Sequence, residues 1–320
     1  MTFSSTTSRN TIQHAILLLI VLACVTALPF QAVAESPRVA SASDWDVREQ
    51  IPLDQFTIQA HRGFGNFGPE GSDDSFRRAW NLGLVPEADL RTTKDGQIVS
   101  FHDATFERIL PNEPELKKKT VRDLTLREFK ELDVGIFRGE EYAGQHGLSL
   151  AEMVELLKQN PSYRLYLDIK DADMNQLARE TTEVRSRLIV ASTDYNLLLA
   201  WKAVAPDGQA ILWMGGSEAE LSKRLDELEI KHFAKLDQLQ IHVSFDAAGK
   251  MSPSDEFLRA AGARLRAHNI LFQTLIWGQA GADATSYARL MSLGCASFAT
   301  DYPEETKNAI EAYYAASRQD

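Results

Sequence analysis

The strongest constraint on the fold of this chain is a repeated alternation that begins at Gln55. Short apolar runs rich in β-branched residues are followed by longer stretches with helical periodicity. This pattern is typical of parallel strands covered by helices, so the predicted fold class is α/β. The predicted strands are Phe56–His61, Val85–Arg91, Ile98–His102, Arg164–Lys170, Arg187–Ser192, Ile211–Met214, Leu239–Ser244, Phe272–Trp277 and Ala296–Thr300.

These strands are one too many for an eight-stranded barrel, and the segment Lys94–Gln97 explains the surplus. Asp95 and Gly96 stand between two alternating runs, which is a strong hairpin signal. We therefore expect an antiparallel hairpin after the second strand, and a two-residue loop would place Asp89 opposite His102. The eight remaining strands predict a TIM (β/α)8 barrel, with a doubly wound sheet as the main alternative.

Helical periodicity fills the stretches between the strands, and a serine at position 72 is a suitable N-cap for the first of them. A stretch at about 104–163 is too long for a simple connection, so we expect a small insertion over the catalytic end of the barrel. The clearest helical patterns are Ser72–Leu82, Leu150–Gln159, Asp194–Val204, Ser217–Leu228 and Asp255–His268.

The first 34 residues have the features of an export signal. Arg9 precedes an apolar run from Ala15 to Leu28, and Ala32-Val33-Ala34 offers small residues for cleavage. We therefore expect a periplasmic or secreted protein. A retained N-terminal anchor is one alternative, and lipidation of Cys24, which ends a sequence loosely similar to a lipobox, is another.

The rest of the chain is expected to be a single barrel domain, 51–320, preceded by a polar linker or loosely docked arm at 35–50. Cleavage after residue 34 would leave Cys295 as the one remaining cysteine, which excludes an internal disulfide. A net charge of -11 argues against binding to nucleic acid or to anionic membranes. Membrane contact is then expected only through a lipid substrate or through Cys24, and the sequence leaves the oligomeric state open.

Polar side chains gather where the predicted strands end, and in a barrel these ends share one face. Glu87 and Asp89 are two residues apart on one strand, so both carboxylates point the same way. The hairpin brings His102 towards them, and Asp168 shares a strand face with Lys170. An oxygen-rich group of this kind suits Mg²⁺ or Ca²⁺.

Further candidate groups follow other strands. His61 can carry a proton, and Arg62 beside it offers a fork of donors suited to phosphate. Glu70, just before a predicted helix, is a candidate metal or hydroxyl ligand, although an acid beside a helix start more often stabilises the helix dipole. Trp277 is either a core residue or a wall of the substrate site.

Taken in order, these motifs resemble the glycerophosphodiester phosphodiesterase family, and the resemblance covers most of the chain from Ala60 to Pro303. It implies a divalent cation, Mg²⁺ or Ca²⁺, bound by the three acids with Glu70 close to it. It also implies His61 and His102 as general acid and base, with Arg62 and Lys170 stabilising phosphate charge. The motifs are His61-Arg62-Gly63, Pro69-Glu70, Glu87-x-Asp89, Thr93-Lys94-Asp95-Gly96, His102-Asp103, Asp168-x-Lys170 and Thr300-Asp301-x-Pro303.

The chain departs from the family pattern at three places. Asp168 stands where the family usually has Glu, Gly71-Ser72 replaces the usual Asn-Thr, and Trp277 lacks the Thr-Val-Asn that usually follows it. An Asp in the first of these positions is similar to the related sphingomyelinase D toxins. The expected reaction is hydrolysis of a glycerophosphodiester to an alcohol and glycerol 3-phosphate. The alternatives are a phospholipase D-like activity on lysophospholipids or sphingolipids and a non-catalytic phosphodiester-binding protein.

Overall fold

The computed structural model describes residues 45–316. The predicted export signal, Cys24 and most of the segment 35–50 lie outside the described residues. Within the described range, no helix combines the length and the apolar character that a membrane crossing requires.

Eight parallel strands form a closed barrel. Each strand pairs with its neighbour along the chain, and β1 pairs with both β2 and β10, which closes the ring. The predicted TIM barrel is therefore confirmed, and closure excludes the doubly wound sheet. The barrel strands are β1 (Thr57–Ala60), β2 (Val85–Thr92), β4 (Leu165–Ile169), β5 (Leu188–Ser192), β6 (Gln209–Met214), β7 (Gln238–Phe245), β9 (Leu271–Trp277) and β10 (Ser297–Thr300).

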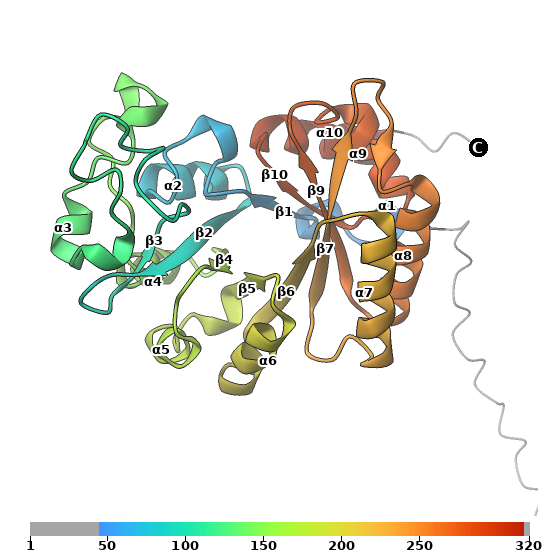
Figure 1. The fold of residues 1–320 in the computed structure, drawn as a ribbon. Helices are drawn as coiled ribbons and strands as arrows, with labels where there is room; N and C mark the ends of the chain where they lie inside the picture. Colours follow the sequence, from blue (N-terminus) through green and yellow to red (C-terminus); the bar gives the residue numbers. More distant parts are fainter. Residues whose placement is uncertain (1–44, 317–320) are drawn as a thin grey trace, which may run out of the picture. The chain divides into compact units, whose positions relative to one another are not determined.

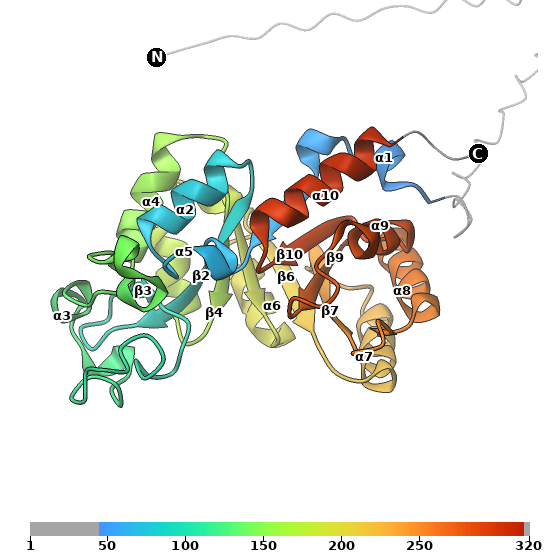
Figure 2. The same cartoon turned by 90° about the horizontal axis from the view of Figure 1, so that it is seen from above.

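Helices surround the strands, as Figures 1 and 2 show. All five helical stretches predicted above are present, and Ser72 caps the first of them by accepting a hydrogen bond from the Ser75 N–H. The outer helices are α2 (Asp73–Asn81), α4 (Leu150–Gln159), α5 (Met174–Glu180), α6 (Tyr195–Val204), α7 (Glu218–Ile230), α8 (Asp255–Ala267), α9 (Ala284–Ser292) and α10 (Pro303–Ala315). The main apolar core lies between these helices and the strands.

The inside of the barrel is closed by a hydrogen-bonded polar layer. The Tyr166 hydroxyl donates to Gln238 at 2.8 Å, and the Gln273 amide donates to the Ser297 hydroxyl at 3.0 Å. Because buried polar groups are stable only when they are hydrogen-bonded, these pairs fix one another. The layer is buried inside the barrel.

The predicted hairpin is present, but its predicted register is wrong by one residue. In the observed pairing of β2 with β3 (Ile98–Ser100), Leu90 lies opposite Ser100, so Asp89 faces residue 101 instead of His102. The loop has three residues because Gly96 has φ 81°, a conformation that favours a three-residue hairpin, and the Thr93 hydroxyl accepts a hydrogen bond from the N–H of residue 97. A two-residue strand β8 (Met251–Ser252), which was not predicted, pairs with β7.

The insertion between β3 and α4 has its own apolar interior, which includes the short helix α3 (Leu126–Lys130). The barrel resumes at α4, whose buried side chains belong to the main core. The insertion therefore spans about 101–149, shorter than the predicted 104–163 at its C-terminal side. Its buried residues, which pack with Val99 of β3, are Phe101, Phe106, Ile109, Leu110, Val121, Leu124, Phe129, Leu132 and Val134.

The described end of the predicted arm forms a short helix, α1 (Val47–Gln50), that contacts the barrel domain. Val47 is fully buried in the main core, and the Trp45 indole donates a hydrogen bond to the Met291 carbonyl at 3.1 Å. Residues 45–50 are therefore docked on the barrel, where the sequence suggested a linker or a loosely docked arm.

Candidate active site

Three buried carboxylates from two neighbouring strands form one cluster at the C-terminal end of the barrel. Glu87 and Asp89 lie on β2, and Asp89 is in register with Asp168 on β4. One oxygen of each lies within 4.8 Å of the others. Burial raises the pKa of Glu87 and of Asp168, and repulsion from the neighbouring carboxylates raises both pKa values further.

This cluster fits a divalent cation. Lys170 Nζ lies 2.6 Å from Asp168 Oδ2 and 3.0 Å from Asp89 Oδ1. The geometry to Asp89 does not satisfy a hydrogen bond, and Asp89 Oδ1 is buried without a donor. A buried carboxylate oxygen without a donor, beside two more carboxylates, is an arrangement that a bound cation completes.

Both predicted histidines lie at this end of the barrel, and both line the same cavity. His61 follows β1, its Nδ1 is 2.7 Å from Asp301 Oδ1, and its Nε2 is 4.0 Å from Glu87 Oε2. Burial lowers the pKa of His61, but the negative charges of Glu87 and Asp301 outweigh this effect and raise the pKa to about 9.

His102 differs from His61 in the partner of its Nε2, which is a guanidinium group instead of a carboxylate. Its Nδ1 is 2.6 Å from Asp103 Oδ1, and the Arg62 guanidinium is 3.0 Å from its Nε2. Because a guanidinium can only donate, Nε2 must accept, and Nδ1 carries the proton that is donated to Asp103. His102 is thus held as the neutral tautomer with its lone pair on Nε2.

Arg62 reaches both the cation cluster and His102. It has φ 53°, an uncommon conformation for a residue other than glycine, and its backbone N–H donates to Glu87 Oε2 at 3.2 Å. Its Nε is buried without a hydrogen-bond partner. A free buried donor beside the carboxylate cluster suits an anionic oxygen of a ligand.

Glu70 does not join the carboxylate cluster, contrary to the expectation that it lies among the cation ligands. Its two oxygens bind three guanidinium groups, at 2.8 and 2.7 Å to Arg108, 3.0 Å to Arg138 and 3.4 Å to Arg62. Burial raises the pKa of Glu70, but these positive charges outweigh the burial and hold the pKa below its ordinary value. Glu70 is therefore ionised, and it holds the side chains of Arg62, Arg108 and Arg138 in place.

A comparison with protein-family models assigns residues 61–305 to the glycerophosphoryl diester phosphodiesterase family. The chain belongs to this family. A glycerophosphodiester phosphodiesterase of Caldanaerobacter subterraneus is 33% identical over 158 residues, which are 47% of this chain and 63% of that protein. One from Bacillus subtilis is 24% identical over 269 residues, 78% of this chain and 85% of that protein. The chain thus spans less than two thirds of the length of the Caldanaerobacter relative.

Solved structures of the family share the fold. A putative glycerophosphodiester phosphodiesterase from Galdieria sulphuraria matches with a TM-score of 0.63 at 20% identity, over 80% of this chain and 97% of that one. An Oleispira antarctica phosphodiesterase, solved in complex with the product sn-glycerol-3-phosphate, matches with a TM-score of 0.61 at 22% identity, over 83% of this chain and all of that one. These matches support the barrel independently of the sequence motifs.

The member of the family described here has an aromatic wall opposite its charged groups. The two sides enclose a cavity of about 90 Å³. Trp277, which the sequence left as either core or substrate wall, is 43% exposed, and its ring is nearly perpendicular to that of His61 at a centroid distance of 5.8 Å. His242 stacks on Trp213 at 5.0 Å, and burial lowers its pKa to about 4, so its imidazole is neutral.

Sequence reasoning missed several of these groups. His242 stands on the same face of β7 as Gln240, so the alternation of side chains along this strand was a usable signal for it. Arg108 and Arg138 had no such signal, because both come from the insertion, whose path the sequence does not define. Asp301 belongs to one of the motifs, but its contact with His61 depends on the closure of β1 onto β10.

Proposed function

We propose that this chain hydrolyses glycerophosphodiesters to an alcohol and glycerol 3-phosphate, with one divalent cation, Mg²⁺ or Ca²⁺. The observation that carries the proposal is the convergence of two carboxylate-paired histidines on one cavity, beside a cluster of three buried acids of which Glu87 and Asp168 line the same cavity. The curated relatives with this family's name and the glycerol 3-phosphate bound to the Oleispira protein support it.

Each group has a role that its contacts suit. Glu87, Asp89 and Asp168 would hold the cation, which neutralises phosphate charge and lowers the pKa of a bound nucleophile. His102 Nε2 carries a lone pair that accepts from Arg62 in the structure. Once Arg62 turns to the phosphate, this lone pair would take the proton of the attacking group, while Asp103 holds the ring in place. His61, paired with Asp301, returns a proton to the leaving oxygen.

The two basic side chains at the site would stabilise the charge on the phosphate. Arg62 contributes a donor at Nε that has no partner in the protein. Lys170 brings an ammonium group to the same cavity as His61 and His102. Preorganised donors of this kind act on the charge that develops in the transition state and are usually a large term in catalysis. Trp277 and the wall behind it would bind the rest of the substrate.

We also infer that residues 1–34 direct export, so that the mature enzyme acts in the periplasm or outside the cell. The inference depends on the apolar run and the small residues at the expected cleavage site. Expression of the full gene, followed by mass spectrometry of the N-terminus of the exported protein, tests it. A mature chain that begins at residue 35 supports the inference, whereas a lipid-modified Cys24 would replace it by a membrane-tethered form.

The reaction is tested with glycerophosphocholine, by coupling glycerol 3-phosphate to NADH formation. Turnover should stop in EDTA and return with Mg²⁺ or Ca²⁺. His102→Gln should reduce turnover by about 10²-fold or more, since a general base contributes that much. His146→Gln is the matched control, because His146 bonds the Leu132 carbonyl inside the insertion. Undiminished turnover in EDTA contradicts the metal role. Cleavage of lysophosphatidylcholine in place of glycerophosphocholine favours the phospholipase D-like alternative.

A further inference from the structure

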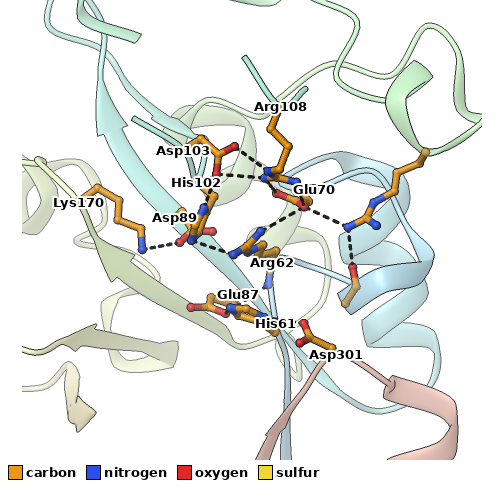
Figure 3. Close-up of polar contacts among 12 residues, drawn as sticks. His61, Arg62, Glu70, Glu87, Asp89, His102, Asp103, Arg108, Lys170 and Asp301 are labelled. Atoms are coloured by element: carbon orange, nitrogen blue, oxygen red, sulfur yellow. Dashed lines mark hydrogen bonds and ion pairs between the residues drawn. The ribbon is translucent and has the colours of Figure 1, made fainter. Parts of the chain in front are cut away.

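Five charged or polar side chains, one of which is His102, form a closed ring of contacts (Figure 3). His102 Nδ1 bonds Asp103, Asp103 bonds Arg108, Arg108 bonds Glu70, Glu70 bonds Arg62, and Arg62 returns to His102 Nε2. The members come from two separate segments, since Arg62 and Glu70 follow β1, whereas His102, Asp103 and Arg108 all lie at the start of the insertion that follows β3.

The strongest contacts of the ring are on the side away from the cation cluster. Arg108 Nη1 and Nη2 bind the two oxygens of Glu70 at 2.8 and 2.7 Å, and Arg108 Nε lies 2.7 Å from Asp103 Oδ2. A bidentate guanidinium fixes a carboxylate in direction as well as in distance. The position of Asp103, and hence the partner of His102 Nδ1, is therefore set by Arg108.

The charges on Glu70 and Asp103 are stabilised within the ring. Burial raises the pKa of each carboxyl, but the guanidinium groups around Glu70, and Arg108 and His102 beside Asp103, lower both pKa values below their ordinary values. Both acids are therefore ionised at neutral pH and act only as acceptors. The two arginines can only donate, so every bond in the ring has a single direction, and this direction leaves the Nε2 lone pair of His102 as the acceptor.

The insertion also supports the ring from outside. Arg138 adds a third guanidinium to Glu70 at 3.0 Å. Arg108 and Arg138 both lie over the ring of Phe137, at 5.6 and 4.8 Å from its centroid. The same aromatic ring thus helps to orient both arginines, and the insertion contributes to the site through their bonds to Glu70 and Asp103.

We propose that Glu70 and Arg108 are positioning residues, which hold Asp103 and Arg62 against the two ring nitrogens of His102 and so fix its reactive tautomer. The role assigned to His102 as general base rests on the proposed function. The arrangement of the five side chains does not depend on that function, because the contacts alone define it. The competing hypothesis is that Glu70 is a fourth cation ligand, and the two hypotheses predict different binding measurements.

The decisive variant is Glu70→Gln, which keeps an acceptor oxygen but removes the charge that binds the arginines. Cation affinity, measured by calorimetry, should stay within about threefold of wild type, whereas Asp89→Asn should weaken it by about 10-fold or more, since the loss of even an outer-shell partner of a metal costs 10–100-fold. Loss of affinity in Glu70→Gln equal to that in Asp89→Asn would show that Glu70 is a ligand and would overturn the proposal.

The tautomer of His102 is measured by nitrogen NMR of protein that contains isotope-labelled histidine. The signal of His102 is the one that is missing from the spectrum of His102→Gln. Wild type should show one tautomer with the proton on Nδ1. Glu70→Gln and Arg108→Met should each shift the signal towards a mixture. Arg122→Met, which removes another insertion arginine that is ion-paired with Asp171, should leave it unchanged. An unchanged His102 signal in both ring variants overturns the proposal.

Kinetics separate positioning from binding. Both ring variants should lower kcat by about 10-fold to 100-fold with little change in KM, as the loss of an outer partner does at comparable sites. A KM increase at constant kcat would assign the ring to substrate binding and overturn the positioning role. Wild-type turnover of glycerophosphocholine tests the proposed function separately, and the NMR and calorimetric results stand without it. If Glu70→Gln does not fold by circular dichroism, Arg108→Met supplies the same measurements.

Discussion

Lys170 occupies the place beside Asp89 and Asp168 that a bound cation needs, and this gives a prediction with opposite effects on binding and turnover. The ammonium is 2.6 Å from one carboxylate and 3.0 Å from the other, and its side chain is 20% exposed. A cation that binds these acids must displace at least the hydrogen bond to Asp168. Such a charged hydrogen bond contributes about 1.5–3 kcal/mol, so Lys170→Met should tighten cation binding by about 10-fold to 100-fold.

The same substitution should reduce turnover, because it removes an ammonium group from the phosphate site. One preorganised donor contributes about 10²–10³ in kcat. Calorimetric titration with Mg²⁺ and Ca²⁺ gives the affinity, and the coupled assay at saturating cation gives the rate. Lys202→Met is the matched control, since Lys202 pairs with Asp237 outside the cavity. Equal or weaker cation affinity in Lys170→Met would refute the competition between the ammonium and the metal.

Three further predictions follow from other parts of the molecule. The free energy that Glu70 contributes relative to Glu70→Gln should be fully present above about pH 4.5, its ordinary pKa, and should be lost as the pH falls through its depressed folded pKa, as measured by urea unfolding across pH. Trp277→Ala should raise KM by about 5-fold to 30-fold with little change in kcat, because an exposed wall contributes binding of roughly 1–2 kcal/mol without touching the reacting atoms, and a fall in kcat alone would contradict this. Removal of residues 1–34 should leave a soluble enzyme with full cation-dependent turnover, and an inactive but folded product would show that the segment belongs to the catalytic domain.

The sequence predicted the barrel well because its signals are local. Each strand is a short apolar run of β-branched residues, and the positions of the strands along the chain were enough to infer closure. The hairpin shows the limit of such reasoning. Asp95-Gly96 suggested a two-residue loop. The Thr93 hydroxyl, however, donates to Asp95 and accepts from the N–H of Gln97, and these bonds stabilise a three-residue loop. The pairing of the two strands is therefore shifted by one residue, and Asp89 no longer lies opposite His102.

The site was predictable where its residues follow barrel strands, and not where they depend on distant contacts. Glu87 and Asp89 share a strand face by simple alternation, and the register of β2 with β4 brings Asp168 beside them. Glu70 was misplaced because its partners, Arg108 and Arg138, come from an insertion with no regular pattern. A lone acid before a helix does not reveal which guanidinium groups will reach it.

The separate apolar interior of the insertion has a consequence for the way the protein loses activity. A segment with its own buried cluster can open as a unit while the rest of the molecule stays folded. Opening of the insertion would withdraw Arg108 and Arg138 from Glu70 without disturbing a single barrel strand. Heating should therefore abolish the proposed turnover below the temperature at which the circular dichroism changes. The insertion would then set the upper temperature limit of the activity, and the barrel would set the melting temperature.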